Sequence, residues 1–154
     1  MEDPDVVVDL AKEVWPWPDN SVDEVIASHV LEHIGEGFFH FMQELYRVCA
    51  PGASVRIAVP HPRSDLYLND PTHVRPITPT MMLMFSKAQW EMLEKRGRRL
   101  TPFWKYLGVD FELLTRMQLV HHESVDQNDP ELGWKELHLN NIIVEYQMTL
   151  KVIK

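Results

Sequence analysis

The sequence predicts an α/β domain built on a mixed sheet. Apolar runs and one clear helix follow each other in the order strand, strand, helix, strand, which is typical of parallel strands joined by crossover helices. The last two predicted strands are joined by a polar connection and can pair antiparallel. A chain of 154 residues, 45% of them hydrophobic, has the size of one domain with a real core. We therefore expect a single domain over residues 1–154.

The first elements are short. Residues Val6 to Asp9 form an apolar run that ends in an acid, which predicts a buried strand. Residues 12–20 contain two prolines and an Asp-Asn pair and are expected to form a loop. Residues Asp23 to Ser28 predict the second strand.

The clearest helix runs from Gly37 to Ala50. Its apolar residues recur at spacings of three and four, which predicts one buried face: Phe38, Met42, Leu45 and Cys49. The Pro51-Gly52 pair should end the helix, and residues Ser54 to Val59 then alternate as a third strand.

The middle of the chain is irregular. Residues His61 to Thr80 carry four prolines and predict a long loop, a kind of segment that is usually functional or disordered. The run Met81 to Phe85 fits core packing better than a lid. Residues Ser86 to Lys95 predict a helix with a serine cap, and Arg96 to Val109 a connector.

The carboxy-terminal part predicts two long strands. They cover Phe111 to His122 and Asn140 to Ile153, and the polar stretch Glu123 to Gly133 between them is turn-like. Together with the earlier elements, they complete a mixed sheet that ends in an antiparallel strand pair.

Charge and composition exclude several classes of protein. A formal net charge of -8 argues against a nucleic-acid binder, because phosphate neutralisation needs a basic surface. No apolar stretch is long enough to span a membrane, and no secretory signal is visible. The single cysteine, Cys49, excludes an internal disulfide and suits a reducing compartment. These features predict a cytoplasmic protein without a membrane partner.

Three segments carry a family resemblance. They are residues Trp15 to Ile34, Glu44 to Pro60 and Asp70 to Arg75. The first two resemble the Pro-x-Pro-Asp-Asn-Ser loop with its following strand, and the helix end with its Pro-Gly turn, in class I S-adenosylmethionine-dependent methyltransferases. The third is similar to a pattern in a branch of predicted small-molecule methyltransferases. The resemblance covers about half of the chain and implies the Rossmann-like fold of that family.

The resemblance also implies a cofactor site for S-adenosylmethionine. Asp9 would accept a hydrogen bond from the adenine amino group, and the backbone of Leu10 would read the adenine ring. Ser28, His29 and Val30 would line the methionine end. These positions follow strand ends, which is where ligands bind in open α/β sheets.

The long loop is where the family places substrate contacts. Asp70, Thr72 and Arg75 are therefore predicted to bind a small or sugar-like acceptor, and His73 to act as a general base. The alternative is a loop tied down by its own Asx turn. For Glu32 and His33 the family motif favours a structural role over catalysis. In a working relative, alignment of the methyl group with the acceptor would supply most of the catalysis.

Two expected parts of the cofactor site are missing. The family's first strand ends in a glycine-rich turn and its second in an acid that binds the ribose, yet no Gly-x-Gly precedes Asp9. We therefore expect a truncated or degenerate relative that binds S-adenosylmethionine weakly or not at all. The alternative function is a non-catalytic binding or assembly module.

Histidines offer one further possibility. His29, His33, His61 and His73 might share a cleft with Asp70, a set that would suit a metal ion. Because no tight ligand motif is present, the sequence favours no metal.

The missing strands also affect assembly. Without strands one and two of the family's sheet, Asp23 to Ser28 would be an unprotected edge. We expect a homodimer with Val6 to Asp9 or this edge at the contact. The alternative is that Val6 to Asp9 fills the empty place beside Asp23 to Ser28.

Overall fold

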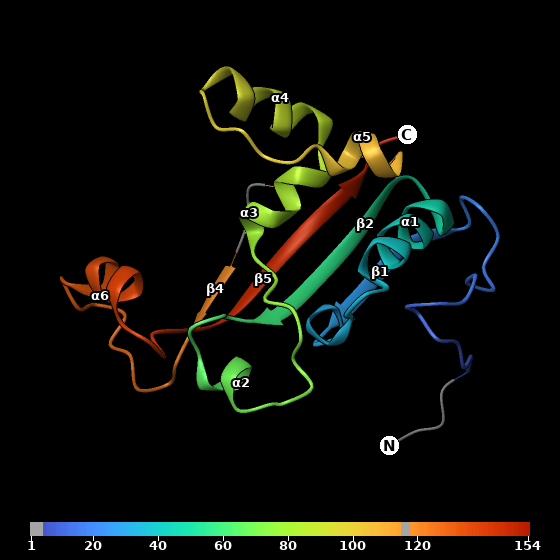
Figure 1. Cartoon of the computed structure of the whole chain (residues 1–154). Helices are drawn as coiled ribbons and strands as arrows, with labels where there is room; N and C mark the ends of the chain where they lie inside the picture. Colours follow the sequence, from blue (N-terminus) through green and yellow to red (C-terminus); the bar gives the residue numbers. More distant parts are fainter. Residues whose placement is uncertain (1–4, 115–117) are drawn as a thin grey trace.

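The structure is a computed structural model, which describes residues 5–114 and 118–154. The described strands form one sheet in the order β1-β2-β5-β3, and β4 also pairs with β5 (Figure 1). Their bounds are Val22–Ser28 for β1, Cys49–Pro60 for β2, Phe111–Leu113 for β3, Gln118–His121 for β4 and Ile143–Val152 for β5.

The sheet is mixed, as the sequence predicted. β1 and β2 are parallel, with Ala27 opposite Ile57. β5 runs antiparallel to β2, with Met148 opposite Ile57, and it pairs antiparallel with β3 and β4 on its other side. The carboxyl ends of β1 and β2 therefore meet the start of β5 at one end of the sheet.

Short helices surround this sheet. They are η1 Leu31–His33, α1 Phe38–Val48, α2 Asp65–Leu68, α3 Pro79–Met82, η2 Leu83–Phe85, α4 Lys87–Lys95, α5 Phe103–Leu107 and α6 Leu132–His138. Figure 1 shows α2 beyond the end of β2, α4 and α5 at the opposite end, and α6 projecting beside β4. Within the described residues, no helix combines the length and apolar character needed to cross a membrane.

Helix α1 supplies much of the core. Its buried apolar side chains recur along one face, as predicted: Phe38, Phe41, Met42, Leu45 and Val48. Its N-cap, Gly37, lies against the backbone of Ala11, and a Cβ at Gly37 would stand only 2.2 Å from the Ala11 carbonyl oxygen. Only glycine allows the chain before β1 to approach the start of α1 so closely.

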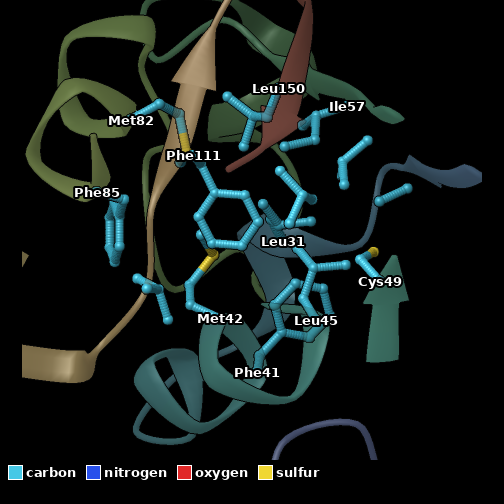
Figure 2. Close-up of a cluster of buried hydrophobic side chains, with 14 of the residues drawn as sticks. Leu31, Phe41, Met42, Leu45, Cys49, Ile57, Met82, Phe85, Phe111 and Leu150 are labelled. Carbon is cyan, nitrogen blue, oxygen red and sulfur yellow. The ribbon is translucent and has the colours of Figure 1, made fainter. Parts of the chain in front are cut away.

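The core lies between α1 and one face of the sheet. Figure 2 shows Phe111 and Leu150 from the carboxy-terminal strands meeting Leu31 and Met42. Along β2, Val55, Ile57 and Val59 are buried, whereas Arg56 is exposed on the other face. Ile26 of β1 is 64% exposed. The second face of the parallel β1–β2 pair is therefore open in the described part of the chain.

Several sequence predictions are confirmed. The helix predicted from Gly37 to Ala50 is α1, and the strand predicted from Asp23 to Ser28 is β1. The helix predicted from Ser86 is α4, and the Ser86 hydroxyl accepts the Gln89 N–H at 3.3 Å. Met82 and Phe85 are fully buried, so the methionine-rich run belongs to the core.

The strand predicted from Val6 to Asp9 is wrong. These residues form no strand, and Val7 is 85% exposed. The Asp9 carbonyl instead accepts the N–H groups of Lys12 and Glu13 in a turn. An extended segment needs a neighbouring strand to satisfy its backbone groups, and β1 pairs only with β2 in the described residues. Val6 to Asp9 therefore does not fill the place beside β1.

Other predictions had the wrong extent. The strand predicted from Phe111 to His122 is divided into β3 and β4, with residues 115–117 outside the described residues. The segments predicted to be irregular contain α2, α5 and most of the turn before α6. These helices have only four to seven residues, too few for a periodic apolar pattern to appear.

Candidate functional site

The turn after β1 is the structural centre of the candidate site. His29 adopts a φ of 52°, while its N–H still bonds to the Ala58 carbonyl at 2.9 Å. A non-glycine residue in the left-handed region is uncommon and often marks a functional site. This turn leads the chain directly into η1.

The His29 side chain links two other elements to this turn. Its Nε2 lies 2.7 Å from Glu145 Oε2 at the start of β5, and its Nδ1 lies 3.3 Å from Glu32 Oε1 in η1. The imidazole is therefore engaged by two carboxylates.

Glu32 is fully buried beneath the long loop. Its backbone carbonyl accepts the N–H groups of Val74 at 2.9 Å and Arg75 at 3.1 Å, which fastens the loop over η1. Its carboxylate is different. Across residues 5–114 and 118–154, neither Oε1 nor Oε2 has a hydrogen-bond partner.

His73 faces this carboxylate from the loop. Its side chain is only 6% exposed, and its Nε2 lies 4.0 Å from Glu32 Oε1 and 3.7 Å from Asp70 Oδ2. Its Nδ1 lies 2.9 Å from the Tyr67 carbonyl oxygen, and its ring stacks on Tyr67. Because a carbonyl can only accept, Nδ1 carries the proton and Nε2 presents a lone pair.

Asp70 and Thr72 form the predicted Asx turn. Asp70 Oδ1 accepts the Thr72 N–H at 2.8 Å and the Thr72 hydroxyl at 2.6 Å. These hydrogen bonds lower the pKa of Asp70, with a smaller contribution from His73 and His33. The Thr72 oxygen also lies 2.9 Å from His33 Nδ1. The turn thus holds His33 beside His73, with their ring centres 4.7 Å apart.

Arg75 fastens the loop. Its guanidinium donates to the carbonyl of Gly35 at 3.1 Å and contacts that of Ile34 at 3.4 Å. It also lies over the Phe38 ring, 4.8 Å from the ring centre. These contacts occupy much of the guanidinium, and substrate binding by Arg75 stays a prediction.

A groove runs along β1 on the side of the amino-terminal segment. It has a volume of about 370 Å³ and mostly apolar walls: Leu10, Trp15, Trp17, Val22, Glu24, Val25, Ile26, Ala27, Val30, Phe41 and Val48. Two of the predicted cofactor residues, Leu10 and Val30, therefore share one groove. Asp9 stands just before it, and its Oδ1 accepts the Ala11 N–H at 3.0 Å.

The other predicted cofactor residues lie elsewhere. Ser28 lines a depression on the open face of the sheet, together with Arg56 and Thr149. His29 belongs to the cluster with Glu32 and Glu145. The structure thus divides the predicted cofactor set between the groove, the open face and the turn.

Arg47 fixes the aromatic wall of this groove. It bonds to both carboxylate oxygens of Glu44, at 2.9 and 2.7 Å, and to the carbonyls of Trp15 and Trp17. The Trp15 N–H donates to Glu44 at 2.8 Å. The bonds from Arg47, followed by that from Trp15, lower the pKa of Glu44 although burial opposes them.

A second pocket opens beside the long loop. Its volume is about 600 Å³, and polar side chains dominate its lining: Asp65, Asn69, Asp70, His122 and Asn141, with Leu66, Pro71 and Val144. Of the predicted substrate residues, only Asp70 reaches it. His61 lies outside the histidine cluster, because its ring packs against Tyr146 and its Nδ1 accepts the Arg63 N–H.

Sequence reasoning missed Glu32 and Glu145 as parts of the cluster. Glu32 lies within the quoted motif, but nothing in the sequence shows that its carboxylate is buried and unpaired. Glu145 comes from a strand more than one hundred residues later, so only the fold brings it to His29. Cys49 is excluded as a nucleophile, since burial raises the pKa of its thiol to about 11.

Comparisons with known proteins agree with this architecture. A family model described as "Methyltransferase domain" matches residues 2–57. A search of curated proteins gives no match. Among solved structures, a SAM-dependent methyltransferase from Archaeoglobus fulgidus is 21% identical with a TM-score of 0.58, and 95% of this chain aligns with 66% of that one.

Two further structures are similar. A SAM-dependent methyltransferase from Methanosarcina mazei is 12% identical with a TM-score of 0.53, and 96% of this chain aligns with 66% of that one. The [4+2]-cyclase SpnF is 18% identical with a TM-score of 0.52, and 96% of this chain aligns with 56% of it. The chain therefore spans about two thirds or less of the length of these structures.

The fold is that of the class I, Rossmann-like methyltransferases. With the family match over the segment that carries β1 and most of β2, the chain belongs to the class I S-adenosylmethionine-dependent methyltransferase superfamily. The family cofactor is S-adenosylmethionine. The similarity to a cyclase shows that this fold alone does not determine the reaction.

Proposed function

We propose that this protein transfers a methyl group from S-adenosylmethionine to a small or sugar-like acceptor. The observation that carries the proposal is the placement of Leu10 and Val30 in one groove beside β1. The turn through His29 connects this groove to the His73 cluster and the polar pocket. Cofactor and acceptor sites would then meet at the carboxyl end of β1, the usual ligand position in this class of fold.

The groove suits the adenosine part of the cofactor. Leu10 and Val30 offer apolar surfaces for the flat adenine ring, and Trp15 and Trp17 form a further wall. Asp9 stands at the edge of the groove with 42% of its side chain exposed. Its second carboxylate oxygen would accept the adenine amino N–H, as the family resemblance implies.

The polar pocket suits a hydroxylated acceptor. Asp65, Asp70, Asn69 and Asn141 supply carboxylate and amide groups that can hydrogen-bond several hydroxyls. Within reach of this pocket, His73 Nε2 would accept the proton of the attacking hydroxyl. Alignment of the two substrates would supply most of the rate enhancement.

Cofactor affinity of this chain should be low. The residues before Asp9 contain no glycine-rich turn and no acid for the ribose. Each absent polar contact removes about 1 kcal/mol of binding free energy. The proposal therefore places recognition mainly on the adenine side.

A comparison of adenosine and inosine tests this function. Inosine lacks the amino group that Asp9 would bind, so adenosine should shift the backbone NMR signals of Leu10 and Val30 at lower concentration than inosine does. The Asp9→Ala variant should lose this preference, while the Asp129→Ala variant, changed on a distant turn, should keep it. Equal responses to both nucleosides in the parent protein would refute the adenine-reading part of the proposal.

A second function has support from β1. This strand has a free edge and an exposed Ile26 beside an apolar groove, features typical of a surface that another protein chain covers. The alternative is therefore a non-catalytic methyltransferase-fold module that binds a partner or a second copy of itself. Protein that binds neither nucleoside yet self-associates through β1 would favour this alternative.

A further inference from the structure

The carboxylate of Glu32 needs a partner. It is fully buried, and neither oxygen has a hydrogen-bond partner among the residues that the structure describes. A buried carboxylate without hydrogen bonds is costly, and such groups are normally paired with a cation or bound to a metal. The space in front of Glu32 is therefore the place to look for a positively charged ligand.

Two imidazoles face the same space. Glu32, His33 and His73 each offer one ligand atom, and these atoms all lie within 4.8 Å of one another. His73 Nε2 is 4.0 Å from Glu32 Oε1 and 3.7 Å from Asp70 Oδ2. Ligand atoms around a tetrahedral zinc ion are separated by about 3.4 Å, given bonds of about 2.0–2.1 Å. Small side-chain movements would close the site.

The hydrogen bonds leave both histidines ready to bind a metal. His73 donates its Nδ1 proton to the Tyr67 carbonyl at 2.9 Å. The Thr72 hydroxyl gives its only proton to Asp70, so its oxygen accepts the proton of His33 Nδ1 at 2.9 Å. Both rings therefore keep an unprotonated Nε2. Metal-binding histidines usually show this arrangement, with the other ring N–H donated to an oxygen.

We propose that Glu32, His33 and His73 bind one divalent transition-metal ion of the zinc class. Two imidazoles and one carboxylate suit zinc and its neighbours, whereas magnesium and calcium prefer oxygen ligands alone. Three protein ligands leave a fourth position, which Asp70, water or a substrate oxygen would occupy. The sequence favoured no metal because these residues come from separate segments; the fold brings them together.

The ion would change the role of His73. As a ligand, Nε2 no longer accepts a proton, and the metal would instead polarise an acceptor hydroxyl next to the Asp70 pocket. This part of the inference rests on the proposed methyl transfer. The metal site itself does not, since its binding can be measured without cofactor or acceptor.

Calorimetric titration of the chelator-treated protein with zinc chloride tests the site. We expect one ion per chain, no heat from magnesium chloride, and more than about 100-fold weaker zinc binding in Glu32→Gln, because even residues outside the first shell often contribute 10–100-fold. His73→Asn should weaken binding similarly. His138→Asn is the matched control, since His138 is an exposed histidine on α6, and it should bind zinc like the parent.

Paramagnetic broadening by cobalt chloride in the unmodified protein serves as a second measurement that needs no variant. The amide signals of Glu32, His33 and His73 should broaden first. Broadening centred on α6, unchanged zinc affinity in Glu32→Gln, or absence of zinc binding by the parent would each overturn the proposal. All three results leave the nucleoside test of methyl transfer unaffected.

Discussion

Replacement of Leu45 by alanine tests the central packing of the fold. Leu45 is 1% exposed on the buried face of α1 (Figure 2). Truncation removes three buried carbon groups and leaves a cavity against the sheet. Comparable leucine substitutions cost about 2–5 kcal/mol, and we expect about 3 kcal/mol here because Met42 on the same face can fill part of the space.

Urea and thermal unfolding followed by circular dichroism measure this change. For a domain of this size, about 3 kcal/mol corresponds to a decrease in melting temperature of about 6–12 °C. Gln43→Ala is the control, because Gln43 is exposed on the same helix and alanine favours helix formation. An unchanged melting temperature for Leu45→Ala would refute the assignment of the buried face.

Other predictions concern ligand, assembly and pH. Calorimetry should show S-adenosylmethionine binding weaker than micromolar; tighter binding would contradict the expected loss of polar contacts. Light scattering should show a homodimer that Ile26→Lys, with a charge on the β1 edge, converts to monomer; a parent monomer at high micromolar concentration would refute this. The lowered pKa of Glu44 means that its contribution to stability is present above the unfolded value of about 4.3 and is lost as pH falls through the lower folded value. The parent should therefore lose more stability than Glu44→Gln between about pH 5 and pH 3, and equal losses would contradict the Arg47 pairing. His73→Ala should abolish any methyl transfer but also lower the melting temperature, because its ring is buried against Tyr67.

The sequence predicted the elements whose patterns are local. Helix α1 has eleven residues with a regular apolar face, and Ser86 provides a cap that hydrogen bonding confirms. The Val6 to Asp9 strand was wrong because four apolar or acidic residues say nothing about a neighbouring strand. Short helices such as α6 depend on contacts with the rest of the chain and leave no periodic pattern.

The candidate site was only partly predictable. The Asp70 to Arg75 motif correctly drew attention to the loop, and the Asx turn was foreseen as an alternative. The contacts of Arg75 with Gly35 and of His29 with Glu145 join distant segments, so no sequence pattern reports them. The same holds for the unpaired carboxylate of Glu32, because burial is a property of the fold.

Intermolecular nuclear Overhauser effects between S-adenosylhomocysteine and the methyl groups of the protein test the proposed function most directly. Weak binding does not prevent this measurement at high ligand concentration. The account predicts contacts from the adenine protons to the methyl groups of Leu10 and Val30. Contacts only with residues on the open face of the sheet, such as Thr149, or no contacts at all, would contradict it.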